Sequence, residues 1–266
     1  MSKEAVFQSF YPNGNLKEER IPLDGYLKRK IKLYYEDGTL KEETEYTENK
    51  KDGVSILYFP DGIIKSNTNY RNGQIHGLGK YFYENGELKA EINYEDGIKN
   101  GPVKIYYLCG SIKEKKSHID DKVEGLVQTF YKSGSIKGEW NYKEGVPDGS
   151  SKFYYETGEL LGEKIYKQGK ENGLTQIYYK NGKLKEQISF EDGQRNGKDL
   201  KYNINGELII QLDYFDGRRE QVGELFPASK PEIKQDVKSS SLKYVLIITG
   251  IFILIFIVYI FLVKSI

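Results

Sequence analysis

A glycine recurs every 24 residues along most of this chain, and this period limits the possible fold more than any other feature of the sequence. Nine copies follow one another without an insertion or a deletion. Such regularity is typical of stacked repeats, because each unit must meet its neighbour with the same geometry. The glycines are Gly14, Gly38, Gly62, Gly86, Gly110, Gly134, Gly158, Gly182 and Gly206.

Each repeat predicts two antiparallel strands joined by a tight turn. An aromatic pair precedes the recurring glycine, and a Leu-Lys or Ile-Lys pair usually follows it. The turn is Asn-Gly or Asp-Gly in most copies, as at Asn85-Gly86, and this dipeptide favours a two-residue hairpin loop. A second pair of glycines, such as Gly97 and Gly101, indicates a longer connection to the next hairpin.

The predicted fold class is therefore all-β. We expect residues 1–225 to form an elongated, twisted antiparallel meander of about nine 24-residue β-hairpins. The composition agrees, since 23 tyrosines and 28 glycines suit many short strands and tight turns.

A two-residue loop would fix which residues face each other across the hairpin, so the two faces of the sheet can be predicted. In the fourth copy the pairs expected on an apolar face are Tyr83 with Leu88, Tyr81 with Ala90 and Gly79 with Ile92. The pairs expected on a charged face are Phe82 with Lys89 and Lys80 with Glu91, and the ion pairs Lys32 with Glu43 and Lys152 with Glu163 repeat this pattern. We expect the charged face to be exposed and to carry tyrosines beside Lys and Glu side chains.

One copy resembles a known repeat. Residues 69–86, NYRNGQIHGLGKYFYENG, resemble the MORN repeat, whose core runs Asn-Gly-x-x-His-Gly-x-Gly followed by aromatic-x-aromatic and another turn. Other copies hold Asp or Asn at the histidine place. Over residues 8–220 the copies are similar to the bacterial MORN-repeat variant family, labelled YwqK-type antitoxin repeat proteins. The residues of segment 69–86 that match the MORN core are Asn72, Gly73, His76, Gly77, Gly79, Tyr81 and Tyr83.

This resemblance implies a β-hairpin repeat fold. The antitoxin label of the family implies binding and neutralisation of a protein toxin. MORN repeats in general imply scaffolding and, in some cases, contact with membrane lipids.

The chemistry of the chain changes after the repeats. Residues 226–241 are polar and contain proline, so we expect a flexible linker. Residues 244–263, YVLIITGIFILIFIVYIFLV, are 20 uncharged and mainly apolar residues, long enough as a helix to cross a bilayer. We predict a transmembrane helix over 242–264 and a short tail of residues 265–266. Lysines lie mainly before this span, so the positive-inside rule predicts a tail-anchored, single-pass protein of the cell membrane with a cytoplasmic repeat domain.

No arrangement in the sequence predicts catalysis. His76 and His118 occupy different places in the repeat without His or Cys at ligand spacing, so both are interpreted as structural. Cys109 takes the Asn place of a turn and is interpreted as an exposed substitution, with a reactive thiol as the alternative. Trp140 is interpreted as filling the apolar side, with an anchor for a partner as the alternative. We therefore expect no enzyme activity, no cofactor, no metal and no small-molecule substrate.

The charge balance narrows the possible partners. The chain has 40 basic and 39 acidic residues, and without a basic surplus the sequence argues against nucleic-acid binding. A repeated face of Tyr, Lys and Glu offers rigid aromatic contact with polar adjustment, which favours binding of a protein. Tyrosines paired with leucine, such as Tyr35, Tyr83, Tyr131 and Tyr155, are interpreted as structural. The candidate partner-binding residues are Tyr34, Tyr58, Tyr106, Tyr154 and Tyr178.

The function that we expect is a non-enzymatic, membrane-tethered scaffold that binds a protein partner. Antitoxin-like neutralisation of a toxin is its most concrete form. The alternative is a module whose repeats bind lipid head groups at the membrane surface. Balanced charge argues against this alternative, because attraction to anionic lipid needs a surplus of basic residues.

Overall fold

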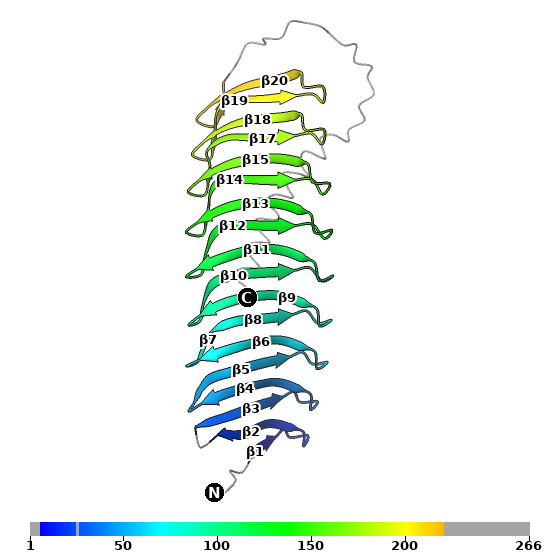
Figure 1. Cartoon of the computed structure of the whole chain (residues 1–266), viewed down its shortest axis with the longest axis vertical. Helices are drawn as coiled ribbons and strands as arrows, with labels where there is room; N and C mark the ends of the chain where they lie inside the picture. The colour runs from blue at the N-terminus through cyan, green and yellow to red at the C-terminus, as the bar shows by residue number, and fades with distance from the viewer. Residues whose placement is uncertain (1–5, 25–26, 221–266) are drawn as a thin grey trace. The chain divides into compact units, whose positions relative to one another are not determined.

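The computed structural model describes residues 6–24 and 27–220, which form one antiparallel sheet of 21 strands (Figure 1). Hairpin follows hairpin in chain order, so the sheet is a meander, and the predicted all-β antiparallel class is confirmed. Within the described residues, no helix is long and apolar enough to cross a membrane. The predicted linker at 226–241, span at 244–263 and tail at 265–266 lie outside the described residues.

The strands group into nine hairpins and three short strands of two residues each, β7, β16 and β21. The strands are β1 (Phe7–Phe10), β2 (Leu16–Asp24), β3 (Lys28–Tyr34), β4 (Leu40–Thr47), β5 (Lys50–Tyr58), β6 (Ile64–Arg71), β7 (Gln74–Ile75), β8 (Gly77–Phe82), β9 (Leu88–Glu95), β10 (Ile98–Tyr106), β11 (Ile112–Ile119), β12 (Lys122–Phe130), β13 (Ile136–Lys143), β14 (Val146–Tyr154), β15 (Leu160–Lys167), β16 (Lys170–Glu171), β17 (Gly173–Tyr178), β18 (Leu184–Glu191), β19 (Gln194–Tyr202), β20 (Leu208–Phe215) and β21 (Arg218–Arg219).

The turn at the recurring glycine is a three-residue loop, which corrects the predicted two-residue loop. In the fourth repeat the Tyr83 N–H donates to the Glu87 carbonyl, and the Gly86 N–H donates to the Tyr83 carbonyl, both at 2.9 Å. Gly86 has a φ of +85°, whereas Asn85 is not in the left-handed region. This is a type I turn followed by a left-handed glycine, the combination known as a G1 bulge.

The bulge moves the register by one residue beside the turn. Phe82 therefore faces Leu88, and the predicted pairs Tyr83 with Leu88 and Phe82 with Lys89 are wrong. Beyond the bulge the prediction holds. The confirmed pairs are Tyr81 with Ala90, Lys80 with Glu91 and Gly79 with Ile92.

The connection between hairpins is a two-residue turn, which corrects the predicted longer connection. Glu95 faces Ile98, and the two residues between them, Asp96 and Gly97, have φ values of +48° and +91°. Positive φ at both positions defines a type I′ turn, whose twist matches that of the flanking strands. The second glycine of the pair, Gly101, lies in a bulge that follows the turn.

This second bulge bends the strand. Between the register pairs of Lys99 and Val103, three residues of β10 face Asn93 alone. Gly101 has a φ of +103° there, a conformation that residues with a Cβ rarely adopt. In two repeats the bulge divides the strand into two consecutive strands, β7 and β8 in one repeat and β16 and β17 in the other.

The two faces of the sheet differ in composition. The face that contains Ala90, Ile92 and Val103, here called the core face, buries these side chains against Tyr81 and Ile105, among others. Two repeats earlier the same places hold Thr44 and Ser55, whose buried hydroxyls lie 2.6 Å apart. The opposite face, here called the outer face, carries the charged residues next to each of these positions. The core face is thus apolar around β9 and β10 and polar nearer the N-terminus.

Tyrosine hydroxyls link neighbouring repeats at the three-residue turns. The Tyr83 hydroxyl donates to the carbonyl of Tyr106, 23 residues later, at 2.8 Å. Phe59 occupies this place in one repeat and has no hydroxyl to donate. Because the acceptor belongs to the next hairpin, these bonds run along the stack of repeats. The donors are Tyr11, Tyr35, Tyr83, Tyr107, Tyr131, Tyr155 and Tyr179.

Backbone groups link neighbouring repeats at the two-residue turns. The Gly97 N–H donates to the carbonyl of Ile75, in the preceding connection, at 2.8 Å. The same bond recurs at six other connections and gives one N–H group of each turn a backbone acceptor. The equivalent donors are Gly73, Asp121, Gly145, Gly169, Gly193 and Gly217.

Candidate functional site

The structure places the five candidate tyrosines in one row on the outer face. Each is the last residue of its strand, namely β3, β5, β10, β14 or β17, and each is half-buried opposite a leucine or isoleucine of the same hairpin. Since one repeat adds two strands, members one repeat apart, such as Tyr34 and Tyr58, are about 10 Å apart, and members two repeats apart, such as Tyr58 and Tyr106, are about 20 Å apart. The register pairs are Tyr34 with Leu40, Tyr58 with Ile64, Tyr106 with Ile112, Tyr154 with Leu160 and Tyr178 with Leu184.

The row contains four further aromatic residues that the sequence analysis did not name. Phe10, Phe82, Phe130 and Tyr202 end β1, β8, β12 and β19 in the same way. Their spacing of 24 residues from the named tyrosines is the signal that would have found them. The candidates are therefore parts of a longer aromatic row, here called the outer aromatic row, in which Phe82 and Phe130 separate some of the tyrosines.

Carboxylates of the preceding hairpin hold most of the candidate hydroxyls. Tyr106 Oη donates to Glu91 Oε2 at 2.8 Å, and burial together with this bond raises the pKa of Tyr106 to about 12. Tyr58 has no such bond within the described residues, although burial and the charge of Glu43 also raise its pKa. The hydroxyls are thus neutral donors, and their rings are fixed in position. The other bonds join Tyr154 to Glu139 at 3.1 Å, Tyr178 to Glu163 at 3.3 Å and Tyr34 to Glu19 at 3.5 Å.

Lysines and glutamates alternate beside the outer aromatic row. The predicted ion pair of Lys32 with Glu43 is present at 3.8 Å. Lys80 faces Glu91 in register, but the ion pair of this carboxylate that lies within the described residues is with Lys104, at 3.9 Å. Such exposed pairs contribute well under about 1 kcal/mol each, so they leave charges free to adjust to a partner.

The tyrosines of the three-residue turns have a structural role in this geometry. Their hydroxyls are used by the bonds to the next repeat, and a lysine covers the ring in most cases, as where Lys89 Nζ lies 5.9 Å from the centroid of Tyr83. The lysine heads remain exposed, and none of them forms an ion pair within the described residues. These lysines are Lys17, Lys41, Lys65, Lys89, Lys113, Lys137 and Lys185.

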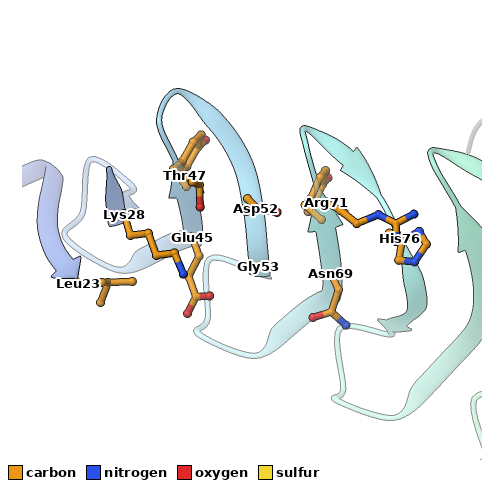
Figure 2. A pocket seen from close by; sticks show the side chains of 11 residues that line it. Leu23, Lys28, Glu45, Thr47, Asp52, Gly53, Asn69, Arg71 and His76 are labelled. Carbon is orange, nitrogen blue, oxygen red and sulfur yellow. The ribbon is translucent and has the colours of Figure 1, made fainter. Parts of the chain in front are cut away.

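A pocket of about 430 Å³ lies near the two-residue turns of β3 to β6 (Figure 2). Charged groups of both signs line it, so it does not select one sign of ligand charge. Arg71 and His76 lie side by side in it, and Lys28 reaches toward Glu45. The lining residues are Leu23, Lys28, Glu45, Tyr46, Thr47, Asp52, Gly53, Asn69, Tyr70, Arg71 and His76.

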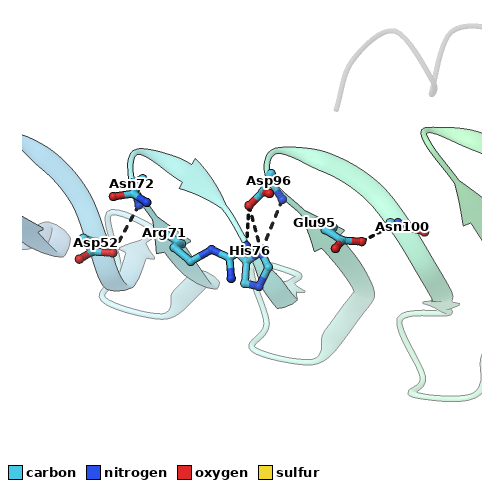
Figure 3. Close-up of polar contacts among 7 residues, drawn as sticks. All are labelled: Asp52, Arg71, Asn72, His76, Glu95, Asp96 and Asn100. Atoms are coloured by element: carbon cyan, nitrogen blue, oxygen red, sulfur yellow. Dashed lines mark hydrogen bonds and ion pairs between the residues drawn. The ribbon is translucent and has the colours of Figure 1, made fainter.

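His76 caps the turn of the next repeat (Figure 3). Its Nδ1 lies 3.5 Å from the Asp96 N–H and 3.4 Å from the Asp96 carboxylate. Arg71 donates to the same carboxylate at 2.9 Å and holds the pKa of Asp96 below its usual range. Asp52 accepts from the Asn72 N–H in the equivalent place. The histidine of the MORN-like copy thus occupies an acceptor position that other repeats fill with a carboxylate.

His118 is buried on the core face, with 6% of its surface exposed. Burial lowers its pKa to about 4, and Lys116 and Lys99 act in the same direction. Its Nδ1 has no hydrogen-bond partner within the described residues. No group of three His, Cys, Asp or Glu side chains that could hold a metal ion occurs in the part of the chain that the structure describes.

Trp140 and Cys109 occupy contrasting environments. Trp140 packs edge-on against Phe153 with 5.4 Å between ring centroids and lies over Gly138, where a Cβ would come within 2.6 Å of the indole. Cys109 is exposed in a turn, and its Sγ lies 3.2 Å from Ser111 Oγ, a contact that lowers the pKa of the thiol. Trp140 thus fills space on the core face.

The comparisons with known proteins concern the repeats. The profile of a family described as MORN repeat variant matches seven segments that together make up more than half of the chain. A typical segment spans one hairpin, as 75–96 contains β8 and β9. No curated protein matches the chain. The matched residues are 3–21, 30–48, 51–72, 75–96, 123–144, 147–168 and 171–192.

Among solved structures, the chain is similar to a porin-like protein from Bacteroides uniformis ATCC 8492. The two share 9% sequence identity with a TM-score of 0.19, over 75% of this chain and 95% of that one. A similarity at this TM-score carries no argument about fold or function.

Proposed function

This chain belongs to the MORN repeat variant family, and we propose that it is a non-enzymatic scaffold that binds a protein partner on the outer face of its sheet. Residues 244–263 tether it to a membrane in this proposal, with the repeats in the cytoplasm. The partner is then held close to the membrane surface. The most concrete form is antitoxin-like neutralisation of a toxin, in which the outer face covers the surface that the toxin needs.

The outer aromatic row is the observation that supports this function. Aromatic residues are enriched in protein interfaces because a rigid ring buries a large area at a low cost in conformational entropy. In this row the bonds from Tyr106 to Glu91 and from Tyr154 to Glu139 already fix the side chains. A partner that docks on the row therefore has less disorder to remove, which favours binding.

Affinity capture from solubilised membranes tests this function. Replacing Tyr106, Tyr154 and Tyr178 together by serine removes three rings of the row, and we expect captured partner to fall at least about tenfold, since each interface aromatic contributes about 1 kcal/mol or more. Circular dichroism checks that the sheet remains. Phenylalanine at the same three positions is the matched control, because it keeps the rings and removes the hydroxyls. Unchanged capture by the serine variant would place the binding surface elsewhere.

Binding of lipid head groups is a second candidate, supported by the exposed lysines of the three-residue turns. Each lies over a ring and keeps its ammonium in solvent, as Lys41 does at 5.4 Å from the centroid of Tyr35. Vesicle flotation of residues 1–225, without the predicted span, separates the two candidates. Flotation that depends on anionic lipid supports this second function, and the absence of flotation supports the protein partner.

A further inference from the structure

The outer aromatic row alternates with aliphatic residues along the stack of strands. Phe130 of β12 pairs with Ile136 of β13, and β13 pairs in turn with β14, which ends at Tyr154. Ile136 therefore lies between two rings of the row, and Ile64 occupies the same place in an earlier repeat. Ile136 is 36% exposed and Ile64 is 37% exposed. The surface between successive rings is thus apolar and open to a partner.

The spacing of the row discriminates among the conformations that a bound chain can have. The strands lie one above another (Figure 1), so one repeat advances the row by two strand spacings, about 9.6 Å. An extended strand returns a side chain to the same side every second residue, after about 6.7 Å. Seven residues of an α-helix advance by about 10.5 Å. One turn of a polyproline II helix, which contains three residues, advances by about 9.3 Å.

Among these conformations, the polyproline II helix stays closest to the register of the rings over several repeats. Across five repeats every third residue of this helix drifts from the row by about 1.5 Å in total. Every seventh residue of an α-helix drifts by about 4.5 Å, nearly half of one repeat. Aromatic-lined surfaces are also the ones on which polyproline II segments dock in other recognition domains. The geometry of the row therefore favours a partner in this conformation.

The hydrogen-bonding groups beside the row favour a partner that has acceptors rather than donors. The carboxylates there are already engaged, as where Glu139 accepts from Tyr154 at 3.1 Å and from Gln128 at 2.8 Å. Lys80 and Lys152 lie two residues before a ring of the row, and neither forms an ion pair within the described residues. Their ammonium groups can therefore donate to a partner. Proline supplies a carbonyl acceptor without a backbone N–H, so a proline-rich chain matches these groups.

From this alternation, spacing and hydrogen-bonding character we propose that the outer aromatic row binds a polyproline II segment with a proline at every third residue. This inference rests on the function proposed above and specifies the chemistry of the protein partner. The segment runs across the strands, and each proline ring sits on an aliphatic residue such as Ile136, between the rings of Phe130 and Tyr154. A proline-rich chain is already extended before it binds, and hydrogen bonds already hold tyrosines such as Tyr154, so little conformational entropy is lost.

Titration with synthetic peptides tests the period of the partner. The full chain, solubilised in detergent, is titrated into a fluorescein-labelled peptide of six Pro-Ala-Gln units, and fluorescence anisotropy measures binding. The control peptide has six Pro-Ala-Gln-Ala units, which place the same number of prolines about 12.4 Å apart, out of step with the row. We expect the Kd of the first peptide to be at least about tenfold lower. Equal Kd values, or no binding of the first peptide at about 1 mM, would overturn the proposal.

Substitutions on one face of the sheet test the place of binding. Ile64→Glu with Ile136→Glu puts charge between the rings at two places, so the Kd of the Pro-Ala-Gln peptide should rise at least about tenfold. Ile165→Glu with Leu174→Glu is the matched control, because these residues are 45% and 41% exposed on the outer face but lie outside the row. The control should leave the Kd unchanged, and circular dichroism checks both sheets. Retained affinity in the first variant, or an equal loss in the control, would overturn the proposal.

These titrations need no natural partner, so they separate this inference from the function on which it rests. Loss of captured partner in the serine variant of Tyr106, Tyr154 and Tyr178, without peptide binding, would leave the scaffold function in place and overturn only the polyproline II partner. Peptide binding together with unchanged capture would support the row as a polyproline II site and overturn its role in holding the captured partner.

Discussion

Neighbouring repeats are joined by side chains at the three-residue turns, which line one side of the sheet, and by the backbone at the two-residue turns, which line the other side. At the three-residue turns, the Tyr131 hydroxyl donates to the Tyr154 carbonyl. At the two-residue turns, the Gly145 N–H donates to the Val123 carbonyl. A side-chain link depends on which residue occupies one position, whereas a backbone link depends on the conformation of the whole turn. The three-residue turns can therefore vary residue by residue, whereas the two-residue turns have positive φ in each connection that the structure describes.

The largest effect that we predict is at His118, beside the two-residue turn of Asp120 and Asp121. Its pKa is about 4 in the sheet and near 6.5 in the unfolded chain, so between these values the unfolded chain binds a proton that the folded chain does not. The free energy of unfolding should therefore fall by roughly 1–3 kcal/mol as the pH is lowered from about 6.5 to 4. Urea unfolding at pH 7 and pH 5 measures this loss.

The control for this prediction is His118→Tyr. Tyrosine is the residue at the equivalent places Tyr94 and Tyr142, and it does not ionise in this pH range. The variant should lose less stability between pH 7 and pH 5 than the unmodified chain. An identical loss in both would mean that other groups cause the acid sensitivity.

The next effect tests the requirement for positive φ at the two-residue turns. Gln168 has a φ of +50°, a conformation in which a β-branched side chain is strained. Gln168→Thr should lower the free energy of unfolding by about 2 kcal/mol. In a three-residue turn, Thr157 already precedes Gly158 with a backbone outside the left-handed region. Thr157→Gln should therefore change the free energy of unfolding by less than about 0.5 kcal/mol. Equal losses of stability at the two positions would remove the distinction between the two kinds of turn.

The tyrosine link of the three-residue turns should have a smaller effect. Tyr131→Phe keeps the ring under Lys137 and removes the hydroxyl that donates to the Tyr154 carbonyl at 2.8 Å. We expect a loss of about 1 kcal/mol in the free energy of unfolding, the typical net contribution of one hydrogen bond. The midpoint of urea unfolding measures it, and a variant as stable as the unmodified chain would show that water replaces the bond without cost.

The smallest effect is a gain at the repeat that lacks this link. Phe59 occupies the tyrosine place, and Lys65 Nζ lies 5.7 Å from its ring centroid, as the lysines do at the tyrosines. Phe59→Tyr would supply a hydroxyl to the Phe82 carbonyl and should stabilise the sheet by about 0.5 kcal/mol. A thermal shift measurement beside Tyr131→Phe gives the two signs in one experiment. Destabilisation by Phe59→Tyr would mean that the site cannot accommodate the hydroxyl.

The repeat period was sufficient to predict the class, the number of hairpins and most of the register. Periodic glycines determine where the chain reverses, and alternation along a strand then assigns residues such as Ala90 and Glu91 to opposite faces. The turn type could not be predicted in the same way, because Asn-Gly suits both a type I′ turn and a type I turn with a G1 bulge. The one-residue difference between these turns produced the wrong pairs at Tyr83 and Phe82.

Contacts between repeats were beyond the sequence reasoning. The place of Tyr106 in each repeat could be predicted, but its bond to Glu91 depends on the distance between neighbouring hairpins on one face. The same holds for His76, whose acceptor role at Asp96 joins residues from different hairpins. Sequence periodicity thus locates candidate residues, and only the spacing of the strands determines their partners.

The backbone link from Gly145 to Val123 has a consequence for how such a chain can evolve. Because any residue supplies the carbonyl, a gene duplication or deletion of one whole 24-residue unit creates a junction that closes with the same bond as before. A gain or loss of fewer residues displaces every later turn from its acceptor. Array length can therefore change in whole units while the order of residues within a unit is preserved.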